Sequence, residues 1–402
     1  MRISTSQLYS QGADAIGRNQ SELFANQQRI ASGKRMLAPS DDPIASAEAV
    51  VVGQSKARVE RFGANLITAA ESLGLNDSIL ADVGDTLIEM RTLAINGGAG
   101  SLSDADRRSL ATDLEGRLQQ LVGLANSRGA DGGYLFGGFA VGTQPFALVG
   151  GSYAYQGDQG QRALTVADGR DLPVSENGEA LFNAVRTGNG TFIARAAATN
   201  AGAGIVAAGS VTDPTLLDGH GYRLHFNVAA GVTTYDVVDV TAATTVSTGN
   251  AYVPGSAIAV AGMQVTITGD PLSGDQFTLT PSGHQSVFTT VQELIATLRA
   301  PTATAGDKAR LGNGLNLALQ NLSQAQEAVL TTRAGLGARM RELDSLAAHN
   351  EARTLQYEAT LSRLQDLDYS KALSDFARQQ LALEASQKSF LQVSGLSLFN
   401  YL

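Results

Sequence analysis

The stretch YSKALSDFARQQLALEASQKSFLQVSGLSLFNYL, residues 369–402, carries an apolar column that repeats every seven residues. The column consists of Tyr369, Phe376, Leu383 and Phe390. Side chains at this spacing stay on one face of a slightly under-wound helix. Because one narrow stripe cannot bury itself, we expect this helix to pack against a partner helix.

The N-terminal residues carry a column with the same spacing: Tyr9, Ile16, Leu23, Ile30 and Leu37. We therefore expect residues 1–38 and 366–402 to pair as a terminal coiled-coil assembly domain. The positions three and four residues further on are mostly Gly, Asn, Gln, Ala or Lys, so both stripes are thin. A pair of thin stripes is expected to need further copies of itself, which indicates a self-assembling protein. The predicted assembly seam consists of Tyr9, Ile16, Leu23, Ile30, Tyr369, Phe376, Leu383 and Phe390.

Two helices are predicted after the N-terminal one. The first begins at Pro43 and ends at Gly97, and a shorter helix opens at Ser103 or Asp104 and closes at Gly129. The longer helix has a seam whose members are alternately three and four residues apart, as in a coiled coil. Its members are Val59, Phe62, Leu66, Ala69, Leu73, Asn76, Leu80, Val83, Leu87, Met90 and Ala94.

Helix returns near Val291 and, after Pro301, runs along one further column of sevens. Single asparagines interrupt the two long seams, Asn76 in the first and Asn350 in the second, and such residues more often fix register than bind a ligand. We expect the two long helices to pack antiparallel in a helical rod core domain, residues 39–143 and 289–365. The second column is Leu315, Leu322, Val329, Leu336, Leu343, Asn350, Tyr357 and Leu364.

Between residues 144 and 288 the helical period gives way to alternation, which is typical of half-buried strands. These residues are predicted to form an outer β-rich domain, either a small sandwich or two subdomains joined near residues 195–210. The predicted fold class is mainly α with a β insertion, a nested coiled-coil rod of N- and C-terminal helices around a β-rich outer domain. The alternating positions include Tyr222, Leu224, Phe226, Val228, Met263, Val265 and Ile267.

Composition excludes several classes of function. The net charge is −9 with no basic cluster, so neither nucleic acid nor an anionic membrane surface is an expected partner. The chain contains no cysteine, which excludes a disulfide framework and a Cys-ligated metal site. The sequence has no run of about 18 apolar residues, so membrane insertion is not predicted. The first residues do not resemble a cleavable signal peptide.

The turn after the first helix reads S-G-K-R and then P-S-D-D-P. Following an N-terminus of the form M-R-I-S-T, this pattern resembles the start of the flagellin and flagellar hook-associated family. Asp42 is predicted to cap the next helix, with Pro43 as its first residue. The adjacent aspartates have no nearby His or Glu partner, so capping is favoured over a metal or acid/base role. The motif residues are Ser32, Gly33, Lys34, Arg35, Pro39, Ser40, Asp41, Asp42 and Pro43.

Two further stretches are more similar to the junction-forming hook-associated members of this family than to filament flagellins. They are residues 131–139, DGGYLFGGF, and the C-terminal LALEASQK with the closing LSLFNYL. The resemblance implies a structural role at the hook–filament junction, extracellular, reached by export without a cleavable signal peptide. The partners that it implies are copies of the chain itself, hook-associated protein 1, flagellin, an export chaperone and the flagellar type III export apparatus.

The alternatives are a filament flagellin and a flagellin-like protein with an enzymatic outer domain. The sequence contains no H-E-x-x-H or G-x-S-x-G motif. Residues 131–139 lack the Lys and Ser/Thr of a phosphate loop, which favours a structural hairpin. His220 and His225 are expected to be solvated rather than bound to a metal. We therefore predict a non-enzyme without catalytic, cofactor-binding or metal-binding residues.

Overall fold

The computed structural model describes residues 5–395, which fall into two compact units. The terminal unit contains residues up to Leu66 and from Ser345 onward, and the central unit is Ile67–Asp344. Two long helices, α2 (Pro43–Gly97) and α5 (Ala305–Gln365), contribute residues to both units. The finer division into terminal, rod and outer domains stays a prediction.

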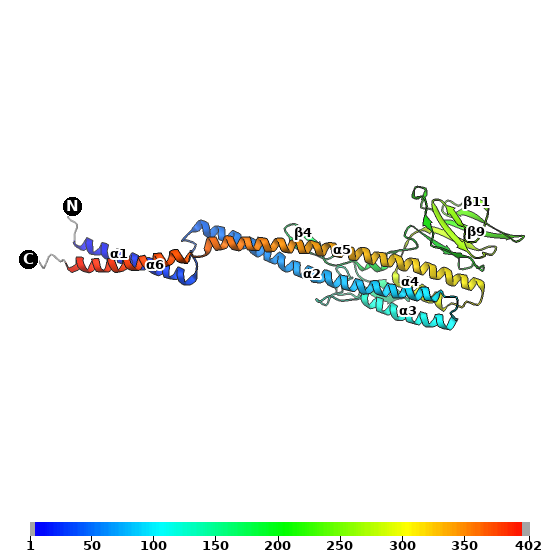
Figure 1. Cartoon of the computed structure of the whole chain (residues 1–402), viewed down its shortest axis with the longest axis horizontal. Helices are drawn as coiled ribbons and strands as arrows, with labels where there is room; N and C mark the ends of the chain where they lie inside the picture. The colour runs from blue at the N-terminus through cyan, green and yellow to red at the C-terminus, as the bar shows by residue number, and fades with distance from the viewer. Residues whose placement is uncertain (1–4, 396–402) are drawn as a thin grey trace, which may run out of the picture. The chain divides into compact units, whose positions relative to one another are not determined.

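In the terminal unit, α1 (Thr5–Ser32) and α6 (Tyr369–Gly395) lie side by side (Figure 1). The first part of α2 runs beside the last part of α5, where Lys56 Nζ lies 2.8 Å from Glu358 Oε1. Because an early residue of one helix meets a late residue of the other, these two segments are antiparallel. No helix within residues 5–395 is both long enough and apolar enough to cross a membrane.

The helices of the central unit bury the predicted heptad columns. Leu73, Leu80 and Leu87 on α2 are at most 2% exposed, and Leu322 and Leu336 on α5 at most 1%. The ion pair of Arg333 Nε with Asp77 Oδ1, at 2.8 Å, joins α5 to α2. Leu315, earlier on α5, approaches Gly98 just after the end of α2, so the two helices are antiparallel here too. Asn76 is fully buried, and its Nδ2 donates to the carbonyl oxygen of Ser72 at 2.8 Å.

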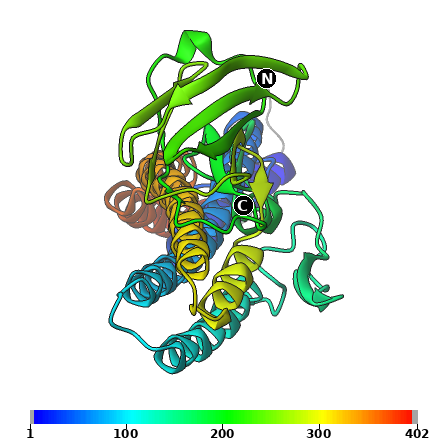
Figure 2. The same cartoon turned by 90° about the vertical axis from the view of Figure 1, so that its right-hand side faces the viewer.

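Two shorter helices complete the helical part of this unit. They are α3 (Asp104–Ala125) and α4 (Val287–Arg299), which lie side by side as the cyan and yellow helices of Figure 2. The prediction that α3 opens near Ser103 is confirmed, because Ser103 and Asp106 form a capping box. The predicted end at Gly129 is wrong: the helix stops at Ala125, and the amide of Asn126 closes its last turn.

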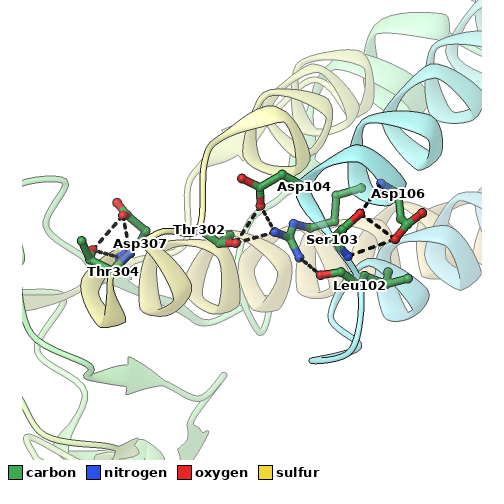
Figure 3. A network of polar contacts seen from close by, with 8 residues as sticks. Leu102, Ser103, Asp104, Asp106, Thr302, Thr304 and Asp307 are labelled. Carbon is green, nitrogen blue, oxygen red and sulfur yellow. Dashed lines mark hydrogen bonds and ion pairs between the residues drawn. The ribbon is translucent and has the colours of Figure 1, made fainter.

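A polar network joins the start of α3 to the segment between α4 and α5 (Figure 3). The guanidinium of Arg107, only 4% exposed, donates to the carbonyl of Leu102 at 2.8 Å and also bonds to Asp104 and Thr302. The hydroxyl of Thr302 in turn donates to Asp104 at 2.8 Å. Because a buried charge is costly without partners, this set of contacts holds the two connections together.

The β insertion lies between α3 and α4 and is antiparallel wherever its strands pair. One five-stranded sheet has the order β11-β10-β9-β14-β6, and a second sheet has the order β12-β13-β7 with β8 also paired to β13. Three two-stranded pairs, β1-β2, β3-β4 and β15-β5, accompany them. The strands are β1 (Phe146–Val149), β2 (Ser152–Tyr155), β3 (Ala163–Ala167), β4 (Arg170–Pro173), β5 (Val185–Arg186), β6 (Phe192–Ala196), β7 (Ile205–Val206), β8 (Ser210–Val211), β9 (Tyr222–Ala229), β10 (Val232–Asp239), β11 (Thr244–Ala251), β12 (Ala257–Val260), β13 (Met263–Thr268), β14 (Gln276–Pro281) and β15 (His284–Gln285).

The two larger sheets share one apolar core, as expected for a small sandwich. Leu224, Phe226, Ile267 and Phe277 are fully buried within it. Residues 195–210, expected as a joint between subdomains, instead supply the end of β6 and the strands β7 and β8 to these sheets.

Residues 131–139 do not form the predicted hairpin, since no strand lies within them. Their apolar anchors are Leu135 and Phe136, and Phe136 meets Phe182 edge-on with ring centroids 5.4 Å apart. Phe182 in turn contacts Phe146 and Phe288, so Phe136 joins an aromatic cluster. Isolated bridges of Tyr134 with Arg128 and of Gly137 with Asn177 take the place of the expected hairpin ladder.

Replacing Leu80 by alanine is expected to lower the free energy of unfolding of the central unit by about 3 kcal/mol, because Leu80 is fully buried in the α2 column. Ile88→Ala, on the same helix but 47% exposed, is a matched control with an expected cost below about 1 kcal/mol. Urea denaturation followed by circular dichroism measures both. Equal losses in the two variants would contradict the assignment of the buried column.

Candidate assembly interface

The terminal helix pair makes intramolecular contacts through seam residues such as Tyr9 and Phe390 and also through small and polar residues next to the predicted seam. The small and polar residues are Gly12, Asn19 and Asn26 on α1 and Gly33 just after its end, each seven residues apart. Asn19 Nδ2 donates to Ser386 Oγ at 2.8 Å, and Asn26 Nδ2 donates to Gln379 Oε1 at 3.1 Å. The close approach of α1 to α6 therefore involves glycine and asparagine residues that are not part of the apolar pattern.

Glycine at position 12 lets an aromatic ring approach the α1 backbone. A Cβ there would lie 2.7 Å from Cδ2 of Phe390, so any larger residue would displace that ring. Phe390 also meets Tyr9 edge-on, with ring centroids 6.1 Å apart. Tyr9 near the start of α1 thus contacts a residue near the end of α6, which makes the pair antiparallel.

The predicted seam residues lie beside this contact, and none of them is fully buried. Tyr9, Ile16, Leu23 and Ile30 on α1 and Phe376, Leu383 and Phe390 on α6 are half-buried, while Tyr369 is 51% exposed. Sequence reasoning missed other apolar side chains of the same helices because they lie off the columns. These more exposed residues are Phe24, Leu373, Leu381 and Leu391. The pair leaves much of its apolar surface uncovered.

The motif residues form the turn between α1 and α2 and join it to the segment before α6. Gly33 has a φ of +68°, in the left-handed region that glycine favours, and its amide closes the last turn of α1 on the carbonyl of Arg29. The amide of Arg35 donates to the carbonyl of Gln365 at 2.7 Å, and the amide of Leu367 donates to the carbonyl of Gly33 at 2.9 Å. Two backbone hydrogen bonds thus join the turn after α1 to the segment before α6.

Charged side chains of the motif hold the same turn. The guanidinium of Arg35 donates to the carbonyl of Leu364 at 2.9 Å and pairs with Asp42 at 3.2 Å. Lys34 Nζ lies 3.5 Å from Asp366 Oδ1. Asp42 accepts the amide of Ala45 at 3.1 Å, as an N-cap does, with Pro43 as the first residue of α2. The other motif members lie at the exposed turn: Ser32, Pro39 and Ser40.

Asp41 is the carboxylate that closes the turn on itself. Hydrogen bonds from the amides of Leu37, at 2.8 Å, and Ala38, at 3.3 Å, hold the pKa of Asp41 below its usual value, with a smaller contribution from the charge of Arg29. Donors that favour the charged form lower a carboxyl pKa. The motif aspartates therefore stabilise the turn as carboxylates that accept hydrogen bonds from backbone amides.

Gly33→Ala is expected to destabilise the terminal unit by about 1–2 kcal/mol, the cost of a left-handed conformation for a residue with a Cβ. That Cβ would also lie 2.9 Å from the hydroxyl of Tyr369. The control is Gly17→Ala in α1, where a Cβ meets nothing within 4 Å and helix propensity favours alanine. Thermal melting followed by circular dichroism is the measurement, and a stabilising Gly33→Ala would refute the role of the turn.

The turn is expected to loosen in acid. Because the folded pKa of Asp41 is lowered, its contribution to stability is complete above the ordinary value of 3.8 and is lost as the pH falls through the folded pKa. Asp41→Asn is expected to remove this pH dependence, whereas Asp14→Asn, an exposed position on α1, leaves it intact. Amide hydrogen exchange at Leu37 between pH 2 and 6 reports the change. Identical profiles for wild type and Asp41→Asn would contradict the assignment.

Comparisons with known proteins show which proteins share this sequence and architecture. The bacterial flagellin N-terminal helical region matches residues 3–140. The flagellar hook-associated protein 3 of Salmonella typhimurium is 28% identical over 402 residues, covering 99% of both chains. The crystal structure of flagellar hook-associated protein-3 from Legionella pneumophila matches with a TM-score of 0.74 and 30% identity, over 78% of this chain and 98% of that one. Xanthomonas campestris FlgL matches with a TM-score of 0.72 and 34% identity, over 77% and 99%.

The flagellin match covers the N-terminal third, whereas the hook-associated relatives match along nearly the whole length. This difference decides between a junction protein and a filament flagellin, and it confirms the nested fold with a β insertion. A flagellar component of this kind has a structural role in the flagellum. The chain belongs to the family of flagellar hook-associated protein 3, the flagellar junction protein FlgL.

Proposed function

We propose that the chain assembles with copies of itself through the apolar surface of its α1–α6 pair and thereby adapts the hook-associated protein 1 zone to the flagellin filament. The observation that carries this proposal is the incomplete burial of the assembly seam. Leu383 is half-buried, and Leu381 and Leu391 on the same helix are each 68% exposed. Exposed apolar surface of this kind is a common sign of a protein–protein interface.

The pattern of contacts in the pair supports this proposal further. The side-chain amides of Asn19 and Asn26 donate hydrogen bonds to α6 of the same chain, and these bonds set the register of the pair. Burying apolar area drives association, at roughly 25 cal/mol per Å² removed from water. The polar contacts and the ring contact of Tyr9 with Phe390 then hold the pair within one chain, while apolar side chains that stay exposed, such as Leu381, are available for neighbouring chains.

The same proposal includes the partners and the route of the protein. By family membership, the partners are further copies, hook-associated protein 1 and flagellin, and the chain reaches the outside through an export chaperone and the flagellar type III apparatus without a cleavable signal. Contacts within one cavity support a structural rather than an enzymatic role. This cavity of about 580 Å³ in the central unit is lined by five polar residues, Thr68, Glu71, Ser72, Asp131 and Arg162, among mostly apolar ones. Asp131 and Arg162 pair at 3.4 Å, and the hydroxyl of Ser72 donates to the carbonyl of Val174 at 2.9 Å. Three of the five polar side chains thus make structural contacts within the chain.

The decisive variant is Leu383→Asp, which puts a carboxylate into the seam. Burying an unpaired charge costs on the order of several kcal/mol in every subunit. Cells with this variant are expected to export the protein, to make hooks without stable filaments, and to shed flagellin into the medium. Electron microscopy of the cells and immunoblots of the medium measure these outcomes.

The matched control is Gln387→Asp, one turn further along α6 at an exposed position. It adds the same charge outside the seam and is expected to leave filaments nearly normal. Immunogold labelling of isolated wild-type flagella is expected to give a narrow band at the hook end. Normal filaments on Leu383→Asp cells, or labelling along the whole filament, would overturn the proposal.

A further inference from the structure

One cluster of titratable side chains has no part in the proposed assembly. It lies in the β insertion, where the loop before β9 meets the end of β10, and it comprises Asp218, His220 and Asp239. His220 was expected to be solvated, but its Nδ1 lies 2.6 Å from Asp239 Oδ2 and 3.7 Å from Asp218 Oδ2. One ligand atom from each residue lies within 4.8 Å of the other two.

Groups outside the cluster orient both carboxylates. Oδ1 of Asp239 accepts the amides of Thr241 and Ala242, at 2.9 and 2.8 Å, which leaves Oδ2 turned toward His220. The hydroxyl of Tyr222, a residue only 4% exposed, donates to Oδ2 of Asp218. Such outer partners fix the direction in which a ligand atom points, as they do around metal sites.

The cluster carries an excess of negative charge. Asp239 is 6% exposed, and a carboxylate buried to this extent needs a positive partner. Among the described residues, the ion pairs of these two carboxylates are with His220. Two carboxylates with one imidazolium still carry a net charge of −1, whereas a divalent cation with a neutral imidazole makes the sum zero.

We propose that Asp218, His220 and Asp239 form a site for a divalent transition-metal cation, with Zn²⁺ as the favoured ion. Imidazole nitrogen and carboxylate oxygen are ligands that zinc accepts, and imidazole disfavours Mg²⁺ and Ca²⁺, which take oxygen ligands. The cation bridges the loop before β9 and the end of β10. It is independent of the terminal helices and therefore of the proposed assembly.

Cation binding and protonation of His220 exclude one another at Nδ1. The Nδ1 lone pair forms the bond to the metal, so the Nδ1 proton must leave and the remaining ring proton stays on Nε2. When the imidazole starts as the imidazolium, one proton is released to solvent for each cation bound, and the two carboxylates stay ionised. Because the ligand nitrogen must be unprotonated, affinity is expected to fall as the pH drops.

The test is isothermal titration of the full-length, chelator-treated protein with Zn²⁺ alone, at pH 7.5 and pH 5.5. One ion per chain is expected, with at least tenfold weaker binding at the lower pH. His220→Ala is expected to weaken binding at least tenfold at pH 7.5, and Ca²⁺ is expected not to bind. Asp218→Asn removes an exposed ligand and so gives a second variant if His220→Ala perturbs folding, which circular dichroism would reveal.

The matched control is His225→Ala, which removes an imidazole from β9 outside the cluster. It is expected to bind Zn²⁺ like the wild type. Equal Zn²⁺ binding by His220→Ala, Asp218→Asn and wild type would overturn the proposal, as would no Zn²⁺ uptake by the wild type at micromolar concentrations. Neither result bears on Leu383→Asp, so failure here is distinguishable from failure of the assembly proposal.

Discussion

The burial of the heptad column shared by α2 and α5 is the interaction on which the central unit depends. Fully buried leucines recur every seven residues, Leu73 and Leu80 on α2 and Leu336 in the column of α5, so an apolar side chain is buried about every two turns. The chain leaves the helical part after α3, forms the β insertion and returns at α4, and α3 and α4 pack on each other. A long insertion at such a point costs little closure entropy once the helices fix its two ends.

Much of this fold could be predicted from the sequence because its strongest signals are periodic. The columns on α2 and α5, the start of α3 at Ser103 and the alternation in β9 and β13 follow from simple repeats of apolar residues. The errors occurred where individual contacts, which leave no periodic signal, decided the structure. The end of α3 depends on the backbone amide of Asn126, and residues 131–139 depend on the position of Phe182, which lies far away in the sequence.

The turns of the sandwich were also hard to predict. Ala230 and Ala261 have φ values of 51° and 45°, each followed by a glycine with positive φ, at the hairpins β9-β10 and β12-β13. Asparagine and aspartate are the usual residues at such positions, so alanine gives no signal. In the interface, the apolar columns were visible, but the contacts of Asn19 and Asn26 were not, because a polar residue beside a seam looks like solvent-facing surface. The cluster at His220 needed the strand register that brings Asp239 beside Tyr222.

The column of Gly12, Asn19, Asn26 and Gly33 restricts how the terminal helices can change in length. Each added residue rotates the rest of a helix by about 100°, so one insertion in α1 would turn this column away from α6. The backbone hydrogen bonds of Leu367 with Gly33 and of Arg35 with Gln365 fix the other end of the pair, so α6 cannot slide to compensate. Lengthening is compatible with this arrangement only in steps of seven residues, made in both helices at once. Terminal helices of this design are thus nearly fixed in residue count.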